Sequence, residues 1–425
     1  MSFRRPRGTR DFTPDELYVR DYIEEKLRKV IENFGYRRVE TPIFEEQKLF
    51  MKKSGEEIIQ HLYDFEDKGG RKLCLRPEAT APVARMYIQE LKHLRKPLKL
   101  YYSGPMFRYE RPQKGRYREF WQVGVELIGA STREADIEIL LLAQTCLKVL
   151  GIKHMLEVSH LGILRGLLSD LGIKETDKII SLLDRGELDE VRKNVKENVL
   201  FDVIGLKGEK EIIDEAKNIL SPYPTAMKSL EELEELMFLL KSVGVEYKVN
   251  LGIVRGLAYY TGMVFEIRVE GLGAQNQICG GGRYDNLIEL FGGKPTPAVG
   301  FAFGFDRVVE TYLHHNLEIL PYKIDGVVAY TTPKLWSQAI NIAQQLRPIF
   351  SIEVDVLGRK LKDQLERASE INADFVIILG EREMENEEVL IKDMKKREQR
   401  TVKMDELKVF LNKNYSRGPE IIPTL

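Results

Sequence analysis

The chain has few of the residues that mark secreted, metal-bound or membrane proteins. Only three cysteines and six histidines occur among 425 residues, and Cys74, Cys146 and Cys279 lie far apart with no CxxC spacing. Neither a disulfide framework nor a structural zinc site is expected, and the thiols should be small buried groups in a reducing compartment. Because no apolar run approaches the roughly 18 to 20 residues of a spanning helix, we expect no membrane partner.

The sequence also shows no signal-peptide pattern and no large excess of positive or negative residues. The N-terminal stretch MSFRRPRGTRDF has no apolar core, which favours a cytoplasmic location. Lys and Arg number 65 against 66 Asp and Glu, so the formal net charge is −1 and no chain-wide basic field indicates nucleic acid. At about 100 to 200 residues per domain, the length predicts two to four domains.

Helix and strand signals are mixed in the N-terminal part of the chain. Thr13-Pro14-Asp15-Glu16 is a capping box that begins an amphipathic helix, and Gly35 is placed to end it. The stretch YRRVETP at 36–42 predicts a strand. Period-two repeats from Lys72 to Gly129, interrupted by helical stretches, favour antiparallel strands mixed with helices.

The pattern then changes twice. Residues 159–245 carry helical periodicity with dense charge, which predicts an inserted helical domain, and strand signals resume in YYTGMVFEIRVEG and AVGFAFG. Beyond Pro321, strands and helices alternate as βαβαβ, which predicts a separate small α/β domain with a largely parallel sheet. The predicted limits are therefore 1–158, 159–245, 246–320 and 326–425.

The most informative stretch is FRYERPQKGRYREFWQVGVELIG at 107–129. Its first part, which we call the arginine-rich loop (residues 108–118), holds five basic residues against one acid, Glu110, and so a local charge of +4. Arginine forks match phosphate oxygens, which suits a polyphosphate or a nucleic-acid end. A solvated loop is the alternative that charge alone leaves open.

The strand after this loop separates two kinds of side chain. Because successive residues alternate between faces, one face collects the apolar residues Trp121, Val123, Val125 and Leu127. The other collects Phe120, Gln122, Gly124 and Glu126. An aromatic ring, an amide and a carboxylate on one face could stack a base, bind a polar ligand and pair with a cation. A solvent-facing strand, the alternative, would also carry polar residues on that face.

Two further segments carry candidate ligand-binding groups. In LRPEATAP at 75–82, Glu78 and Thr80 could bind an ammonium group or simply cap a helix, and the local chemistry does not separate these alternatives. The segment 254–262 places Arg255 near Tyr259 and Tyr260, between glycines that permit close backbone approach.

Two glycine-containing segments complete the set of candidates. GGGRYDNL at 280–287 predicts a Gly-rich turn, and it fits neither the dinucleotide nor the P-loop motif. In GFAFGFDRV, Arg307 falls in the first turn of a helix, where the helix dipole disfavours a cation. That position indicates either a functional role for Arg307 or an ion pair with Asp306.

Taken together, these segments resemble the histidyl-tRNA synthetases, a family of class II aminoacyl-tRNA synthetases, over nearly the whole chain. FRYERPQKGRYREFWQ, the helix before YRRVETP and GFAFGFDRV are similar to the three class-defining motifs, and the helix is the one at the family's dimer interface. LRPEATAPVAR and IVRGLAYYTGMVFE resemble the two histidine-specific stretches. The resemblance implies an α+β fold: a class II antiparallel-sheet catalytic domain with a helical insertion, plus a C-terminal α/β anticodon-binding domain at 326–425.

The resemblance also implies a reaction and its residues. L-Histidine and ATP would form histidyl-adenylate, with Mg²⁺ accompanying ATP, and histidine would pass to the terminal adenosine of histidine tRNA. Catalysis would rest on Arg255, Arg108 and Arg307; no metal ligand is assigned. Contacts to histidine are implied for Glu78, Thr80, Arg108, Gln122, Glu126, Arg255, Tyr259 and Tyr260. Contacts to ATP are implied for Arg108, Glu110, Arg116, Arg118, Phe120 and Arg307.

Two departures and one rival accompany this resemblance. Ala258 stands where the family usually has an acid, which puts the local support of the pocket in doubt, and Trp121 replaces a residue that is often histidine. The rival is the catalytically inactive regulatory subunit of ATP phosphoribosyltransferase, which would lack the C-terminal domain and several of these arginines. The resemblance further implies a cytoplasmic homodimer.

Overall fold

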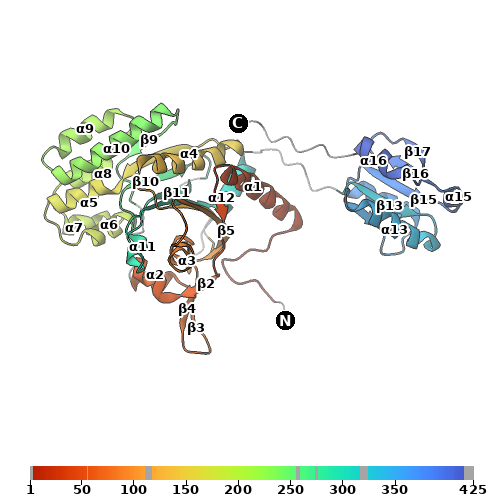
Figure 1. The fold of residues 1–425 in the computed structure, drawn as a ribbon, viewed down its shortest axis with the longest axis horizontal. Coiled ribbons are helices and arrows are strands. Elements are labelled where there is room, and N and C mark those ends of the chain that lie inside the picture. Colours follow the sequence, from red (N-terminus) through yellow and green to blue (C-terminus); the bar gives the residue numbers. More distant parts are fainter. Residues whose placement is uncertain are drawn as a thin grey trace. The chain divides into compact units, whose positions relative to one another are not determined.

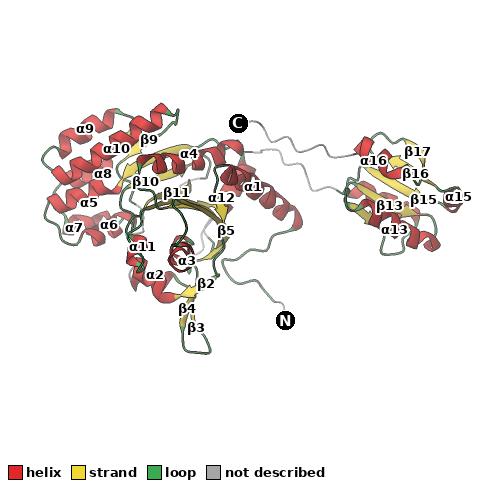
Figure 2. Ribbon diagram, in the orientation of Figure 1, coloured by secondary structure: helices red, strands yellow, loops and turns green. Residues whose placement is uncertain are grey.

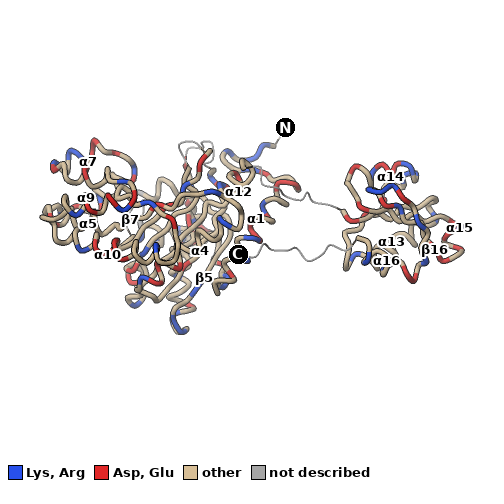
Figure 3. Tube along the Cα trace, turned by 90° about the horizontal axis from the view of Figure 1, so that it is seen from above, with Lys and Arg blue, Asp and Glu red and all other residues tan. Residues whose placement is uncertain are grey.

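A computed structural model of the protein describes residues 3–54, 56–110, 117–254, 259–272, 276–315 and 324–415. The chain divides into two compact units, Met1–Glu318 and Ile319–Leu425, and each is described by itself below (Figure 1). Acidic and basic residues are interspersed over both units (Figure 3), as the near-zero net charge indicates. Within the described ranges, no helix has both the length and the apolar composition to cross a bilayer.

Nine of the described strands of the first unit form one sheet, in the order β1-β5-β6-β12-β11-β10-β7-β9-β8. Neighbours pair antiparallel except β1 with β5 and β7 with β9, which pair parallel. The strands are β1 (Arg37–Arg38), β5 (Leu98–Phe107), β6 (Glu119–Ile128), β7 (Met155–His160), β8 (Lys207–Gly208), β9 (Lys248–Asn250), β10 (Met263–Arg268), β11 (Gln277–Arg283) and β12 (Ala298–Gly304). The predicted antiparallel sheet is confirmed, although the strand predicted at 36–42 is only the two residues of β1.

Helices and a small second sheet surround this sheet. A three-stranded sheet pairs β4 with β2 and β3, and the helix α1 contacts α4 and α12. The predicted capping box is present, because Glu16 N donates to Thr13 Oγ1 and Thr13 N donates to Glu16 Oε2. These elements are α1 (Pro14–Asn33), β2 (Phe44–Glu46), α2 (Gln47–Ser54), η1 (Glu56–His61), β3 (Asp64–Glu66), β4 (Lys72–Leu75), α3 (Thr80–Met86), η2 (Tyr87–Leu91), α4 (Arg133–Val149), α11 (Leu287–Leu290) and α12 (Phe305–His314).

A group of helices is inserted between β7 and β9, as Figure 2 shows in red beside the sheet. Helix α10 packs closely on α5, because Gly166 carries no Cβ; such an atom would lie 2.7 Å from Ala226 N. The helical insertion is thereby confirmed, whereas its limits at 159 and 245 stay a prediction. The helices are α5 (Leu161–Asp170), α6 (Thr176–Asp184), α7 (Leu188–Asn194), α8 (Val199–Gly205), α9 (Glu211–Leu220) and α10 (Pro224–Ser242).

The second unit is built on a five-stranded sheet in the order β14-β13-β15-β16-β17. The three strands expected from the sequence pair parallel, but a hairpin, β16 and β17, adds two antiparallel strands that the prediction missed. Buried clusters on the two faces are formed with α13 and α14 respectively. The elements are β13 (Gly326–Tyr330), η3 (Pro333–Leu335), α13 (Trp336–Leu346), β14 (Ile352–Val354), α14 (Leu361–Glu370), β15 (Phe375–Leu379), α15 (Glu381–Glu385), β16 (Glu388–Asp393), β17 (Gln399–Lys403) and α16 (Leu407–Tyr415).

Two further expectations have clear outcomes. The three cysteines are buried, as predicted. The Gly-rich turn predicted at 280–287 is wrong at its start, because Gly280 to Arg283 belong to β11 and pair with both β10 and β12. The glycines are needed for close strand approach, since a Cβ on Gly281 would lie 2.6 Å from Phe301 Cβ. The chain turns only after Arg283.

Candidate active site

The arginine-rich loop joins β5 to β6, and its two ends are held together. Arg108 N donates to Arg118 O at 2.9 Å, and Arg118 Nε donates to Glu110 O at 3.1 Å. The Arg118 guanidinium also lies 4.2 Å from the centroid of the Tyr109 ring. Arg116 falls outside the described residues, as do Arg111 and Lys114. The structure therefore describes the base of this loop.

A cavity of about 650 Å³, which we call the arginine cavity, opens beside the base of the loop. Five residues implicated in ATP or histidine binding line it: Arg108, Glu110, Phe120, Gln122 and Arg307. Arg108 is held by its Nε, which donates to Pro77 O at 2.9 Å, and its guanidinium lies 5.1 Å from the Phe120 ring centroid. Arginines and an exposed ring face can together receive a phosphate chain and a base.

Gln122 brings an acceptor to this cavity. It lies on β6 between Phe120 and Glu126, as the period-two pattern predicted, and its Oε1 is buried with no hydrogen-bond partner in the described structure. A buried acceptor without a partner carries a desolvation cost. A ligand that donates hydrogen bonds, such as an ammonium group, would remove that cost.

The carboxyl group of Glu126 is the most enclosed acid of the site, at 1% exposure. Gly300 lies opposite it in the β6–β12 register, and a Cβ on Gly300 would overlap Glu126 Oε2. Tyr284 OH donates to Glu126 Oε2. Burial raises the pKa of Glu126 to about 8, while hydrogen bonds from Tyr284 and Thr80 oppose the rise. The carboxyl group thus sits where an imidazole N–H could be recognised in a dry environment.

Glu78 both caps a helix and forms a buried ion pair. Its carboxylate accepts hydrogen bonds from Thr80 N at 2.8 Å and Ala81 N at 3.1 Å, so Glu78 satisfies backbone donors at the start of α3, while its binding of an ammonium group stays a prediction. The same carboxylate lies 2.9 Å from Lys53 Nζ, whose side chain is 1% exposed. Burial lowers the pKa of Lys53, and the charge of Glu78 opposes that effect.

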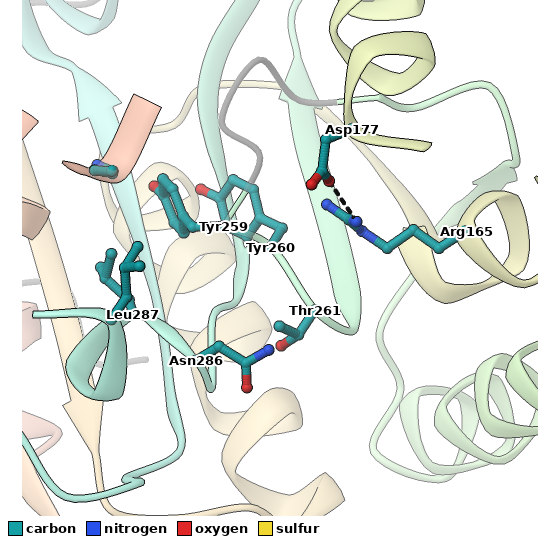
Figure 4. Close-up of a pocket in the computed structure, with 9 residues that line it drawn as sticks. Arg165, Asp177, Tyr259, Tyr260, Thr261, Asn286 and Leu287 are labelled. Atoms are coloured by element: carbon teal, nitrogen blue, oxygen red, sulfur yellow. Dashed lines mark hydrogen bonds and ion pairs between the residues drawn. The ribbon is translucent and has the colours of Figure 1, made fainter. Parts of the chain in front are cut away.

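Tyr259 and Tyr260 line a second cavity of about 490 Å³, which we call the tyrosine pocket. Their rings lie 4.5 Å apart by centroids, and Figure 4 shows both side chains beside Asn286 and Thr261. The pocket also reaches the inserted helices, where Arg165 Nη1 on α5 donates to Asp177 Oδ1 on α6 at 2.7 Å.

The two cavities are connected through shared neighbours. Lys53, which lines the tyrosine pocket, pairs with Glu78, and Glu78 follows the Pro77 carbonyl that holds Arg108. Tyr284, which donates to Glu126, packs its ring 5.7 Å from that of Tyr259. Most of the candidate residues therefore form one continuous cluster.

Some candidates fall outside this cluster, and some members of it were missed. Arg255 and Ala258 lie outside the described residues, and Arg118 does not line either cavity. Sequence reasoning missed Lys53 and Tyr284. Lys53 follows another lysine at the end of α2, a pattern typical of a solvated helix end, so only its burial identifies it.

Comparisons with known proteins agree on one family. A family model described as histidyl-tRNA synthetase matches residues 8–308, and one described as an anticodon-binding domain matches residues 324–414. The histidine–tRNA ligase of Archaeoglobus fulgidus is 48% identical over 416 residues, which are 96% of this chain and 99% of that protein.

Solved structures of similar fold extend the comparison. The apo histidyl-tRNA synthetase of S. aureus is 28% identical with a TM-score of 0.72, covering 96% of this chain and 99% of that one. A Bacillus halodurans chain described as an ATP phosphoribosyltransferase regulatory subunit/histidyl-tRNA synthetase is also 28% identical, with a TM-score of 0.75, covering 89% of this chain and 98% of that one.

Proposed function

Because the chain belongs to the histidyl-tRNA synthetase family, we propose that it is a histidine–tRNA ligase. It activates L-histidine with ATP to histidyl-adenylate and diphosphate, and it then transfers histidine to the 3′-hydroxyl of the terminal adenosine of its tRNA, releasing AMP. The observation that carries this conclusion is the face of β6. Phe120, Gln122 and Glu126 run along it from the arginine cavity to a buried carboxyl group.

We assign histidine recognition to the inner end of that face. Glu126, oriented by Tyr284, would accept a hydrogen bond from the imidazole, and Tyr260 would address its other nitrogen. The unpartnered Gln122 Oε1 and the carboxylate of Glu78 would accept from the α-ammonium, with Thr80 beside them. Lys53 keeps Glu78 paired in the absence of ligand, which reduces the cost of burying that charge.

ATP is assigned to the arginine cavity. Phe120 would stack adenine, Arg307 would cover its other face, and Arg108 would hold the α-phosphate beside the incoming carboxylate. Glu110 lines the same cavity, and Arg116, Arg118 and Arg255 are assigned from the resemblance alone. As a carboxylate oxygen of histidine attacks phosphorus, negative charge develops on the phosphoryl oxygens. Fixed guanidinium groups stabilise that charge without reorganisation.

Mg²⁺ is assigned as a companion of ATP. Among the described residues no group of three or more His, Cys, Asp or Glu side chains could hold a metal by itself. Mg²⁺ is commonly bound by one or two carboxylates together with substrate phosphates. Glu110 fits such a shared site, since it lines the cavity, whereas Asp306 already accepts from two arginines. When bound, the ion would neutralise phosphate charge.

The regulatory-subunit alternative is not favoured. It predicts the loss of the C-terminal domain and of several arginines, but residues 324–414 match an anticodon-binding domain and Arg108 and Arg307 line the arginine cavity. A homodimer and a cytoplasmic location remain our proposals, and they rest on the resemblance to the family, in which the α1 segment is similar to the dimer-interface helix.

The proposed activation step can be tested directly. The purified protein with Mg²⁺ should exchange labelled pyrophosphate into ATP when L-histidine is supplied, and other amino acids should support little exchange. The reason is that adenylate formation is reversible and requires a filled histidine pocket. A protein that shows no histidine-dependent exchange is not this enzyme.

The tRNA-binding part of the proposal concerns the second unit. Strands β13, β14 and β15 are parallel, so the segments after them lie at one edge of the sheet, where ligands of open α/β sheets bind. That edge presents exposed groups suited to single-stranded RNA: Val356 and Leu357 are 80% and 73% exposed, and Trp336 and Lys360 are exposed beside them in the fold. We propose that this edge contacts the anticodon loop.

Lys360→Glu tests that edge. Lys360 is the N-cap of α14, where an acid is favourable to the helix, so reversal of its charge should not destabilise α14. We expect the KM for tRNA in aminoacylation to rise about tenfold from the lost and reversed phosphate contact, with histidine-dependent exchange unchanged. The control is Lys396→Glu, because the β16–β17 turn lies at the opposite edge. Equal effects of the two reversals would contradict the assignment.

A further inference from the structure

The carboxylate of Asp306 joins three segments that are far apart in the sequence. Its Oδ1 accepts hydrogen bonds from Arg10 Nη2 and Arg20 Nη1, each at 2.6 Å, and its Oδ2 accepts one from Trp121 N at 2.8 Å. The side chains of Arg20 and Asp306 are only 8% and 9% exposed. Charge-assisted hydrogen bonds of this kind are strong, and in a desolvated setting they hold a single geometry.

Asp306 and Trp121 line the arginine cavity themselves, and each is next in sequence to a residue that the proposed function assigns to ATP. Trp121 follows Phe120 on β6, and Asp306 precedes Arg307 in the first turn of α12. Phe120 and Arg307 both line the cavity, whereas neither Arg10 nor Arg20 is among the described residues that do. The two arginines therefore affect the cavity indirectly, through the Asp306 carboxylate to which both donate hydrogen bonds.

The same N-terminal segment supports the downstream end of the arginine-rich loop. Arg118 N donates to Gly8 O at 2.8 Å, and the Arg10 guanidinium lies 3.6 Å from the centroid of the Tyr117 ring. Gly8 has a φ of +86°, and a Cβ there would lie 2.7 Å from Arg118 Cγ. Glycine is therefore required at this position both by conformation and by the close approach.

Contacts between the Arg20 guanidinium and three aromatic rings connect the N-terminal segment with α12 and β6. The Arg20 guanidinium lies 4.2 Å from the Phe12 ring centroid, 5.0 Å from that of Phe305 and 5.9 Å from that of Trp121. It thus contacts the N-terminal segment, the start of α12 and β6 at once. A cation over ring faces and against a carboxylate resists displacement in several directions.

We propose that the segment Gly8–Arg20 is a brace that positions the ATP-binding groups, with Arg10, Arg20 and Asp306 as positioning residues. This inference rests on the proposed function, because that function assigns ATP to the arginine cavity. Loosening the brace would let Phe120 and Arg307 move relative to one another, and small misplacements of binding groups cost large factors in rate. The proposed imidazole contact at Glu126 lies farther along β6, and Tyr284, which follows β11, donates a hydrogen bond to it, so this contact should be spared.

The test uses the full chain and the histidine-dependent exchange reaction, with separate titrations of ATP and histidine. Arg20→Gln, Asp306→Asn and Arg10→Gln should each raise the KM for ATP about tenfold while the KM for histidine changes less than twofold. Arg10→Lys should recover part of the loss, because it restores the charge at Asp306. The matched control is Arg5→Gln, which removes an exposed ion pair with Asp11 in the same segment and should change neither KM.

The outcomes separate a positioning role from a purely structural one. If the variants only lower the fraction of folded protein, the apparent kcat falls and both KM values stay unchanged, and the brace is refuted. An equal rise in both KM values refutes it as well. If circular dichroism shows that the Arg20 and Asp306 variants do not fold, the result for Arg10→Gln tests the brace, because the Arg10 side chain is 25% exposed and its replacement should perturb folding least. An unmodified protein without histidine-dependent exchange would refute the proposed function instead.

Discussion

Arg108→Ala should lower the rate of histidine-dependent pyrophosphate exchange by about a thousandfold, because one preorganised cation is lost where phosphoryl charge develops. Arg108 is suited to that task by its surroundings. Its Nε donates to Pro77 O, so the plane of the guanidinium is set before ATP binds. The remaining N–H groups of the fork are the ones that can meet phosphate oxygens. The loss should appear in kcat as well as in kcat/KM, since the contact strengthens in the transition state.

A conservative variant and a control variant test whether the loss is specific to the Arg108 guanidinium. Arg108→Lys keeps the charge but not the fork, so its rate should lie between those of the parent and the alanine variant. Arg192→Ala is the control, because Arg192 stacks 3.9 Å from the Phe201 ring within the inserted helices and lines neither described cavity. Exchange by Arg108→Ala within tenfold of the parent, under saturating substrates, would show that this arginine does not act on the phosphate.

Glu126→Gln should raise the KM for histidine by about 30-fold. The imidazole N–H would favour the ionised carboxylate when histidine binds, and glutamine replaces that charge-assisted hydrogen bond by a neutral one. The KM for ATP should stay within twofold of the parent, since Glu126 is not among the described residues that line the arginine cavity. Glu138→Gln is a matched control: it makes the same change in the same unit at an acid paired with Lys99. An unaltered KM for histidine in Glu126→Gln would remove Glu126 from imidazole recognition.

Although Glu126→Gln should weaken histidine binding, it should raise the stability of the folded protein at alkaline pH. Burial raises the pKa of Glu126 from its ordinary value of 4.5 to about 8 in the folded protein. Between these values the folded protein keeps a proton that the unfolded chain releases, so the parent loses stability as pH rises through this range. Glutamine cannot ionise. Without histidine, Glu126→Gln should therefore match the parent in thermal unfolding near pH 4.5 and exceed it near pH 8.5.

Period-two and helical patterns were sufficient to predict much of the fold and one face of the site. Phe120, Gln122 and Glu126 share a face because strand side chains alternate, and β6 is ordinary enough in composition to obey that rule. The β11 glycines violate a local rule, since GGG is typical of a turn. They form a strand because β10 and β12 approach too closely for any side chain. The turn propensity of a short segment cannot predict contacts with strands that are distant in the sequence.

Three members of the site could not have been found from local sequence. Lys53 resembles a solvated lysine until α2 and α3 bring it against Glu78, and Tyr284 acquires its role only through its contact with Glu126 from another strand. Asp306 is similar. The sequence left open a functional role for Arg307 or an ion pair with Asp306, and it gave no sign that the Asp306 carboxylate accepts from Arg10 and Arg20, which lie almost three hundred residues away.

The sequence by itself determined the chain's division into an antiparallel sheet with inserted helices and a C-terminal α/β unit, and the resemblance of its motifs to a known family indicated the reaction. It also indicated why a net charge of −1 is compatible with binding ATP and tRNA, since positive charge is concentrated at residues 108–118. Only the tertiary structure decided which buried acids pair, which carboxyl group has a raised pKa and which distant segments meet beside the arginine cavity. These properties depend on desolvation and on contacts between distant segments, and neither is encoded in the spacing of neighbouring residues.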